Sequence, residues 1–303
     1  MNNSECQNLK LSVQIKKPHL SKKYILSEKY AILEALEKKR TFEPYSKNSL
    51  IVSHLERLGL RQKAINFEMC GELVTKYKCE NCGHIEYVNR SSCNLRICKR
   101  CSRKLYKKLW KKYVDTIKLM KRPKLLTLTF GFTPMLYPEV ISEFRKMFSK
   151  LRKRFKTIKG GIYVFEVKRS PRKVECIEVH IHALIDSVYI PQKEISEAWF
   201  EISGRFIVDI RKAYSCKKGL GYILKYVSKP PEFPLARDYA SYEFMFNKRR
   251  RVQGFGSCYN VKTSLVIMEI TCSFCGSKML KIEETSCWIL EHKLRDMLKT
   301  GDG

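Results

Sequence analysis

The sequence has few acidic residues and no long apolar run. Its 303 residues include 30 Asp and Glu against 60 Lys and Arg, a formal net charge of +30. No stretch approaches the roughly 18 consecutive apolar residues that a membrane-spanning helix needs. The first ten residues, MNNSECQNLK, also lack the apolar segment of a secretory signal. We therefore expect neither a membrane nor a secreted protein, but an intracellular, cytoplasmic one.

The cysteines do not have the arrangement of a disulfide framework. There are 13 of them, an odd number in a long chain, and several form C-x-x-C pairs. Such pairs in a reducing compartment are typical of metal ligation. The sequence therefore predicts structural zinc and no disulfide scaffold.

The excess of basic residues favours an anionic partner. A charge of this size destabilises a compact chain through self-repulsion unless a partner neutralises it. A nucleic acid is the leading candidate and an acidic membrane surface the next. The 44% hydrophobic content is enough for at least one core. We expect the run of Arg249, Arg250 and Arg251 to contact a DNA backbone.

The chain divides into four predicted segments. Residues 1–75 form a helical N-terminal region, and residues 76–122 a cysteine module with a basic helix that ends before Pro123. Residues 123–230 form a domain of alternating strands and helices. Residues 231–303 form a basic C-terminal region that begins with the prolines of KPPEFP.

Hydrophobic periodicity predicts the fold class. Apolar residues at helical spacing indicate helices over residues 27–40 and 48–65. Within residues 123–230 the order is strand, helix, strand, strand, helix, strand, helix. The economical architecture is one antiparallel sheet with packed helices. The predicted class is therefore α+β, with a zinc-ribbon-like module and a helical N-terminus.

Four cysteines have the spacing of a zinc ribbon. Cys79 and Cys82 form one C-x-x-C knuckle, and Cys98 and Cys101 form a second one fifteen residues further on. Four thiolates leave no open coordination position for water, so we expect a structural site. The set Cys82, Cys93, Cys98 and Cys101 stays open as an alternative. A weaker competitor is His84.

A further knuckle lies near the C-terminus. Cys272 and Cys275 form half of a zinc site, and the nearby residues that could complete it are Cys287 and His292. A complete Cys-Cys-Cys-His site and an incomplete ribbon without metal are equally compatible with this spacing. The scattered cysteines are expected to be small buried side chains: Cys6, Cys70, Cys176, Cys216 and Cys258.

Two histidines form a candidate site on a strand. Alternation in residues 176–186 places His180 and His182 on the face opposite Val179 and Ile181. A lone His-x-His is more often a polar face than a metal site. Glu166 lies on the polar face of the preceding strand, and residues 170–172 favour a hairpin. If the strands pair, Glu166 and both imidazoles could converge on one cation with positions left open for substrate.

Two tyrosines occur on the last helix of this domain. Tyr222 and Tyr226 are one turn apart, and Lys225 and Lys229 form a second pair with the same spacing. Such tyrosines are usually core or interface residues. Their place in the chain favours function, because a strand with two threonines and then the His-x-His strand precede them.

Three segments together resemble a known family. KLLTLTF, VHIHALID and YILKYVSK are similar, in order and spacing, to the three motifs of HUH-superfamily rolling-circle replication initiator (Rep) proteins, whose relatives include HUH transposases and relaxases. The tyrosine pair resembles the two-tyrosine branch. The cysteine clusters before the first motif are similar to those of plasmid-type initiators. The resemblance covers about residues 76–256.

The resemblance implies an HUH endonuclease with an RRM-like βαββαβ core. Such a protein nicks single-stranded DNA at a replication origin by transesterification. A tyrosine hydroxyl attacks the phosphodiester, which leaves a 5′-phosphotyrosine and a free 3′-hydroxyl. The resemblance assigns a catalytic Mg²⁺ or Mn²⁺ to His180 and His182, with Glu166 as third ligand. It assigns the nucleophiles to Tyr226 and Tyr222.

Lysines next to the tyrosines are expected to help the reaction. A phenol with a pKa near 10 needs stabilisation of its developing charge, which Lys225 or Lys229 could supply. Because both lysines flank Tyr226, we expect Tyr226 to attack first and Tyr222 to act in strand transfer. The reverse order, or alternation, stays open.

Two other functions agree with these motifs. A two-tyrosine HUH transposase would use the same chemistry, and a zinc-ribbon DNA-binding regulator would use none of it. The leading expectation is a plasmid- or virus-encoded replication initiator whose partners are single-stranded DNA and the host replication helicase and polymerase.

Overall fold

The computed structural model forms two compact units, each built from segments far apart in the sequence. Unit 1 contains Met1–Lys38, Val74–Asn89 and Glu269–Gly303, and unit 2 contains Lys39–Leu73 and Arg90–Met268. The structure describes residues 28–40, 49–89, 91–134, 139–169, 176–262 and 270–299.

These units differ from the four consecutive segments expected from the sequence. The expected cysteine module of residues 76–122 is divided between both units, and so is the expected C-terminal region. Cys6 and residues 170–172, which the sequence singled out, lie outside the described residues. No described helix is both long and apolar enough to cross a membrane.

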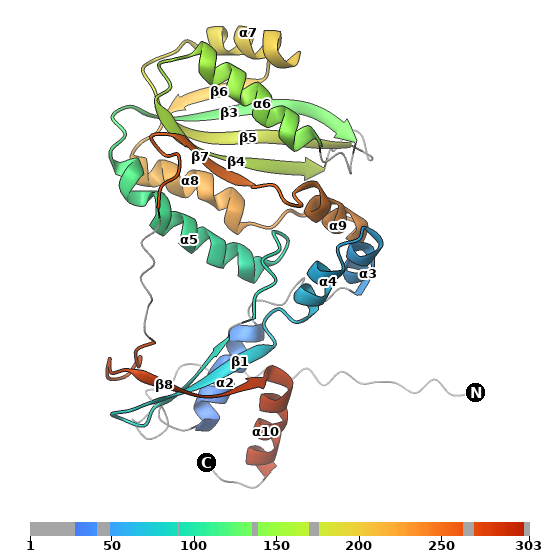
Figure 1. Ribbon diagram of the computed structural model, residues 1–303, viewed down its shortest axis with the longest axis vertical. Helices are drawn as coiled ribbons and strands as arrows, with labels where there is room; N and C mark the ends of the chain where they lie inside the picture. The colour runs from blue at the N-terminus through green and yellow to red at the C-terminus, as the bar shows by residue number, and fades with distance from the viewer. Residues whose placement is uncertain are drawn as a thin grey trace, which may run out of the picture. The chain divides into compact units, whose positions relative to one another are not determined.

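The described part of unit 2 contains a five-stranded antiparallel sheet. Its strand order is β6-β3-β5-β4-β7 (Figure 1). The α+β class with an antiparallel sheet is thus confirmed, and β7 is a strand that the sequence did not predict. The bounds are β3 Pro123–Pro134, β4 Gly160–Arg169, β5 Cys176–Asp186, β6 Val208–Lys212 and β7 Val252–Gly256.

Helices cover both faces of this sheet (Figure 1). On one face, α6 (Glu139–Arg154) and α7 (Gln192–Ser203) pack against residues such as Phe165 and Ile181. On the other face, α5 (Lys99–Lys118) and α8 (Cys216–Ser228) pack against Val164 and Leu184. Because side chains alternate along a strand, neighbouring residues of β4 and β5 contribute to different cores.

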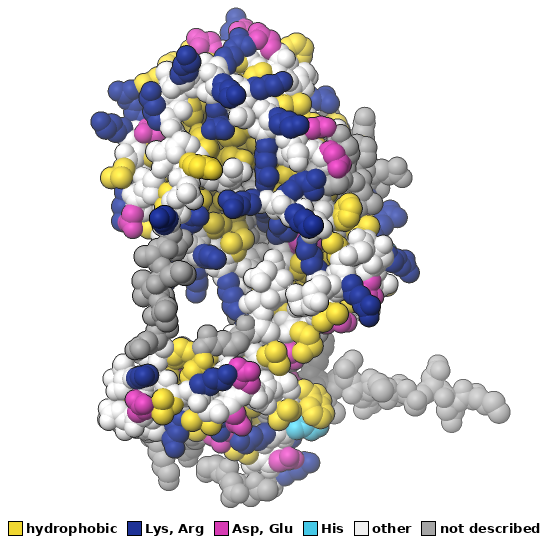
Figure 2. All heavy atoms as spheres, in the orientation of Figure 1, with side chains coloured by type: hydrophobic (Ala, Val, Ile, Leu, Met, Phe, Trp, Pro, Cys, Tyr) yellow, Lys and Arg dark blue, Asp and Glu magenta, His cyan; other side chains and the backbone are white. Residues whose placement is uncertain are grey.

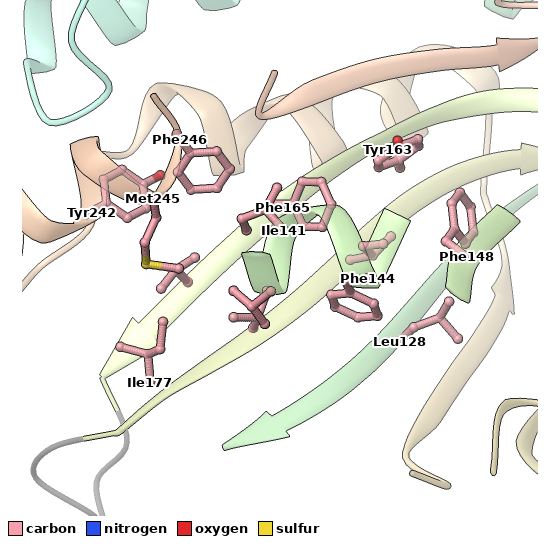
Figure 3. Close-up of a cluster of buried hydrophobic side chains, with 14 of the residues drawn as sticks. Leu128, Ile141, Phe144, Phe148, Tyr163, Phe165, Ile177, Tyr242, Met245 and Phe246 are labelled. Carbon is pink, nitrogen blue, oxygen red and sulfur yellow. The ribbon is translucent and has the colours of Figure 1, made fainter. Parts of the chain in front are cut away.

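Aromatic side chains fill the core beneath α6 and α7 (Figure 3). The ring centroid of Phe144 lies 5.9 Å from that of Phe165 and 5.5 Å from that of Trp199. Helix α9 (Ala236–Met245) extends this core with the buried Tyr242 and, just after its end, Phe246. Such packed rings contribute more stability than their buried area alone.

The helical stretches expected near the N-terminus are present in the described residues, with one difference. The helix expected over residues 48–65 is two helices, α3 (Ser49–Arg57) and α4 (Arg61–Glu68). Gly59 separates them with a φ of +72°, a left-handed conformation that favours glycine. Ile51, Leu55 and Phe67 join the core of unit 2.

Unit 1 has a smaller sheet of its own among the described residues, ordered β2-β1-β8. Its buried core includes Ile32, Val74, Tyr87 and Leu290. The carboxylate of Glu28 is hydrogen-bonded to two lysines and a tyrosine: Lys76, Tyr87 and Lys293. Its elements are α2 Glu28–Arg40, β1 Leu73–Cys79, β2 Ile85–Asn89, β8 Met279–Ser286 and α10 Cys287–Lys299.

A buried carboxylate holds the loop before α5. The side chain of Glu243, on α9, is fully buried and forms an ion pair of 3.0 Å with Arg96. It also accepts hydrogen bonds from the backbone N–H groups of Arg96 and Ile97. This contact therefore anchors the loop to the core.

We expect Glu243→Gln to destabilise unit 2. The variant keeps the shape of the side chain but loses the negative charge opposite Arg96. The Arg96 guanidinium is then left without its ion-pair partner, which lowers the stability of the folded state. The free energy of unfolding should fall by about 2 to 4 kcal/mol, measured by urea denaturation. Glu232→Gln is a matched control, because Glu232 is 71% exposed. Equal stability of the two variants would contradict this role.

Candidate functional site

Four cysteines of unit 2 converge in one buried cluster. Cys70, Cys93, Cys98 and Cys101 have their Sγ atoms within 4.8 Å of one another. The separations are 3.7 Å for Cys70 to Cys98, 3.6 Å for Cys70 to Cys101 and 3.5 Å for Cys93 to Cys101. Sulfurs at about 2.3 Å from a tetrahedral zinc lie about 3.8 Å apart. The cluster could therefore hold a metal ion such as zinc.

The elements around this cluster explain its geometry. Cys98 is the N-cap of α5 and Cys101 lies in its first turn, so both thiols are at the beginning of one helix. Cys70 follows the end of α4, and its Sγ accepts a hydrogen bond from the backbone N–H of Cys93. Hydrogen bonds from Cys70, Cys93 and Cys98 lower the pKa of the Cys101 thiol far below its usual value. The contacts among the four thiols raise the pKa of Cys93 and Cys98 instead, so the thiolate, the form that binds metals, is favoured at Cys101.

A second group of four cysteines lies in unit 1. It contains Cys79, Cys82, Cys272 and Cys275, with Sγ separations of 3.4 Å for Cys79 to Cys275 and 3.7 Å for Cys82 to Cys272. This cluster could also hold a metal ion such as zinc.

The two knuckles of this second cluster have the same turn. Gly83 follows one pair with a φ of +68°, and Gly276 follows the other with a φ of +74°. The N–H of each glycine donates to the carbonyl of the first cysteine in its knuckle, Cys79 or Cys272. A left-handed glycine lets the chain turn tightly around a metal position.

The expected ligand set of Cys79, Cys82, Cys98 and Cys101 is therefore wrong. The structure divides it: the first pair joins Cys272 and Cys275, and the second pair joins Cys70 and Cys93. The alternative set with Cys82 is wrong for the same reason, although Cys93 is a member of one cluster.

The proposed partners of the C-terminal knuckle are also corrected. Cys287 is fully buried in the apolar core of unit 1, and the ring of His292 packs on Trp288 with centroids 4.2 Å apart. A sequence signal for the true pairing exists. Both knuckles of the second cluster read C-x-x-C-G, whereas Cys101 is followed by Ser102.

The predicted histidine site lies on the face of the large sheet that α8 covers. The sheet register aligns Thr127 with His182, and Thr129 with His180. On the other side of β5, Glu166 is the register partner of His180. The predicted pairing of β4 with β5 is thus confirmed, and it brings Glu166 beside both histidines.

Threonines orient the two imidazole rings. Thr127 Oγ1 lies 3.1 Å from His182 Nδ1, and Thr129 Oγ1 lies 3.1 Å from His180 Nδ1, each within hydrogen-bonding distance. The Nε2 atoms are therefore the nitrogens left for other partners. Sequence reasoning placed the threonines in a motif but gave them no role.

The two Nε2 atoms have different surroundings. His182 Nε2 is hydrogen-bonded to Glu166 Oε2 at 2.7 Å. Nε2 of His180 is buried and has no hydrogen-bond partner in the described part of the chain, although Glu178 Oε2 lies 3.4 Å away. Burial lowers the pKa of His180, which favours the neutral ring that a metal requires.

Lys168 adds a positive charge next to Glu166. Its Nζ lies 3.1 Å from Glu166 Oε2. Burial raises the pKa of Glu166, but the hydrogen bond with His182 and the charge of Lys168 outweigh burial, so the net pKa lies below the usual value. The group is thus a carboxylate at neutral pH.

One of the two predicted tyrosines, Tyr226, lies directly over His182. The ring of Tyr226 is parallel to that of His182, at an angle of 3° and a centroid distance of 3.9 Å. Tyr226 Oη donates a hydrogen bond of 3.0 Å to Tyr222 Oη. Burial, and then the contact with Tyr222, raise the pKa of Tyr226 well above its usual value. The two phenols and the histidines therefore form one group.

Two basic side chains, Arg211 and Lys225, lie next to Tyr222. Arg211, on β6, donates a hydrogen bond of 3.1 Å from Nη2 to Tyr222 Oη. The Nζ of Lys225 lies 4.0 Å from the ring centroid of Tyr222 and 5.0 Å from that of Tyr226. The predicted Lys229 instead forms an exposed ion pair with Glu232. Sequence reasoning missed Arg211, which no motif marks.

Contrary to what the sequence predicted, the structure does not place Arg251 where it could contact DNA. Its side chain is buried, and its Nε donates a hydrogen bond of 3.1 Å to the carbonyl of Phe165. Its Nη2 donates to the carbonyl of Tyr226. Arg251 therefore connects α8 to the strand that carries Glu166, and its guanidinium is not available to a phosphate.

The histidine pair fits a divalent cation in two respects. Nε2 of His180 is buried and has no hydrogen-bond partner among the described residues, so its lone pair could bind a metal. A threonine hydroxyl at each Nδ1 can accept the ring N–H and so fix the orientation of the imidazole. Among the described residues, the groups whose ligand atoms all converge are the two cysteine clusters. A cation at the histidines would require Glu166 to exchange its bond with His182 for one to the cation.

Among the charged side chains on the visible face of unit 2, Lys and Arg are the more common. Figure 2 shows Lys and Arg spread over the face that it presents, with fewer Asp and Glu among them. Lys107, Lys108 and Lys111 are exposed on α5, the helix that packs beside α8. Exposed lysines of this kind bind phosphate backbones.

Comparison of the chain with models of protein families, with curated proteins and with solved structures found no match. The interpretation of the site therefore depends on the residues themselves.

We expect two zinc ions per chain, lost independently. Cys70→Ser should lose one zinc and Cys275→Ser the other, because each variant removes a ligand from a different cluster. Metal analysis of the purified variants measures this directly. Cys176→Ser, outside both clusters, should retain both ions. One zinc in the wild type, or two in Cys70→Ser, would contradict the division.

Proposed function

We propose that this chain is a metal-dependent endonuclease that nicks and rejoins single-stranded DNA through a 5′-phosphotyrosine intermediate, and that it initiates rolling-circle replication. The observation that carries the proposal is the stack of Tyr226 on His182, with Tyr222 hydrogen-bonded to Tyr226. Residues about 40 positions apart in the sequence thus form one group with the composition that the chemistry requires.

The arrangement of the strands supports the same proposal. The chain order is β3, α6, β4, β5, α7, β6, and the strand order among these is β6-β3-β5-β4. A βαββαβ core is what the resemblance to HUH initiators implies. Its central strands carry Thr127, Thr129, His180 and His182, so the candidate site lies in the middle of the sheet.

His180, His182 and Glu166 would hold Mg²⁺ or Mn²⁺. When bound there, the cation would polarise a phosphate oxygen and orient the bond for in-line attack. The tyrosines supply the nucleophile, and a tyrosyl ester conserves the energy of the phosphodiester bond. The hydroxyl oxygens of the two tyrosines lie 3.0 Å apart. The second tyrosine could therefore attack while one DNA end is still attached to the first.

The threonines allow the histidines to change partners. A threonine hydroxyl both donates and accepts hydrogen bonds. When His182 Nε2–H donates to Glu166, Thr127 can donate to Nδ1. When Nε2 is needed as a ligand, the ring proton can lie on Nδ1 and donate to Thr127 instead. This adjustment needs no movement of the sheet.

We expect the purified chain to acquire label from single-stranded DNA when Mn²⁺ is present. A random-sequence oligonucleotide pool labelled at its 3′ ends should label the protein covalently, because the 5′-phosphotyrosine retains the 3′ portion of the strand. The same pool labelled at its 5′ ends should not. Omission of Mn²⁺ should abolish labelling. Mn²⁺ is omitted and no chelator is added, because a chelator would also extract the zinc. Denaturing electrophoresis measures the adduct.

Variants identify the source of the label. Labelling should be lost in Tyr222→Phe/Tyr226→Phe and in His180→Ala/His182→Ala, while most DNA affinity remains, because the basic surface provides it. Tyr214→Phe is a matched control, since that tyrosine is 97% exposed and outside the site. A wild type that binds DNA but acquires no label would favour a non-enzymatic DNA-binding regulator.

A further inference from the structure

The two tyrosine hydroxyls of the site are not equivalent. Tyr222 Oη accepts two hydrogen bonds, one from Tyr226 Oη at 3.0 Å and one from the Arg211 guanidinium at 3.1 Å. Tyr226 Oη is the donor in its hydrogen bond with Tyr222 Oη. The donors of the site therefore point at one oxygen.

This asymmetry matters when a phenol becomes a nucleophile. The attacking oxygen must lose its proton, and donors already aimed at it stabilise the negative charge that develops. Tyr222 has both a neighbouring hydroxyl and a permanent cation in position. Lys225 adds a second positive charge over the same ring, at 4.0 Å from its centroid.

The sheet holds Arg211 in place. Arg211 lies on β6, where it is the register partner of Leu125 in β3. Its Nε lies 3.7 Å from a carboxylate oxygen of Asp209 on the same strand, while its Nη2 points to Tyr222. The guanidinium is half-exposed and thus remains accessible from solvent.

We infer that Tyr222 forms the first covalent link to DNA, and that Arg211 is a catalytic residue that stabilises the Tyr222 oxygen during attack. The inference rests on the proposed function. It reverses the order expected from the lysine spacing, which gave no weight to Arg211.

The attack exchanges one phosphoester bond for another. The Tyr222 hydroxyl releases its proton to solvent water, and its oxygen forms a bond to the scissile phosphorus. The bond from phosphorus to the 3′ oxygen breaks, and that oxygen takes a proton from solvent. The products are a 5′-phosphotyrosine and a free 3′-hydroxyl. Tyr226 keeps its proton in this step and remains available for the second attack.

Trypsin distinguishes the two tyrosines without any mutation. Cleavage after Lys218 and Lys225 releases residues 219–225, which contain Tyr222, and a following peptide that begins at Tyr226. The wild-type chain is incubated briefly with the oligonucleotide pool and Mn²⁺, digested with nuclease and trypsin, and examined by mass spectrometry. The nucleotide remnant should lie on the peptide of residues 219–225.

Arg211 is tested in the same assay. Arg211→Met should lower the initial rate of adduct formation about 100-fold, the usual effect of losing one donor to an oxyanion. Arg211→Lys should recover part of the rate. Lys212→Met, which removes the adjacent exposed charge, is the matched control.

The outcomes separate the inference from the proposed function. A remnant on the peptide that begins at Tyr226, or equal losses in Arg211→Met and Lys212→Met, would overturn the inference alone. Absence of an adduct from every chain would overturn the proposed function and the inference with it.

Discussion

The register of β3, β5 and β4 is the constraint on which the candidate site depends. Hydrogen bonding between the strands aligns Thr127 with His182 and Thr129 with His180, and brings Glu166 beside them. A shift of one residue in the register of β5 would point the histidine side chains into the aromatic core. Phe165 and Ile181, which alternate with the site residues, are fully buried there. The core that stabilises the sheet therefore also keeps the polar side chains on the α8 face.

The second requirement is that α8 lies close to the sheet. Gly219 makes this possible, because a Cβ atom at that position would lie 2.8 Å from Leu184 Cδ1. Arg251 then connects the carbonyl of Tyr226 to β4. With the helix in this position, the Tyr226 ring stacks on His182. Packing, a buried guanidinium and ring stacking together determine where the phenols lie.

Local patterns predicted β3, β4, β5, β6 and the tyrosine helix, because alternation and helical spacing are properties of short segments. The cysteine pairing was not predictable by spacing alone. Cys79 and Cys275 are 196 positions apart, yet their Sγ atoms are 3.4 Å apart. Arg251 was expected to contact a DNA backbone because it belongs to a run of three arginines, and only the fold reveals that it bonds two carbonyls. Arg211 belongs to no motif, since its role depends on the pairing of β6 with β3.

The most direct test of the account is strand rejoining. Adduct prepared with the wild-type chain is freed of unbound DNA and given an excess of an oligonucleotide with a free 3′-hydroxyl, without any nucleoside triphosphate. Transesterification through tyrosine predicts a new phosphodiester that joins the two DNA segments and releases the protein, because the tyrosyl ester supplies the energy. Release of only a 5′-phosphorylated fragment, with no joined strand, would contradict the account.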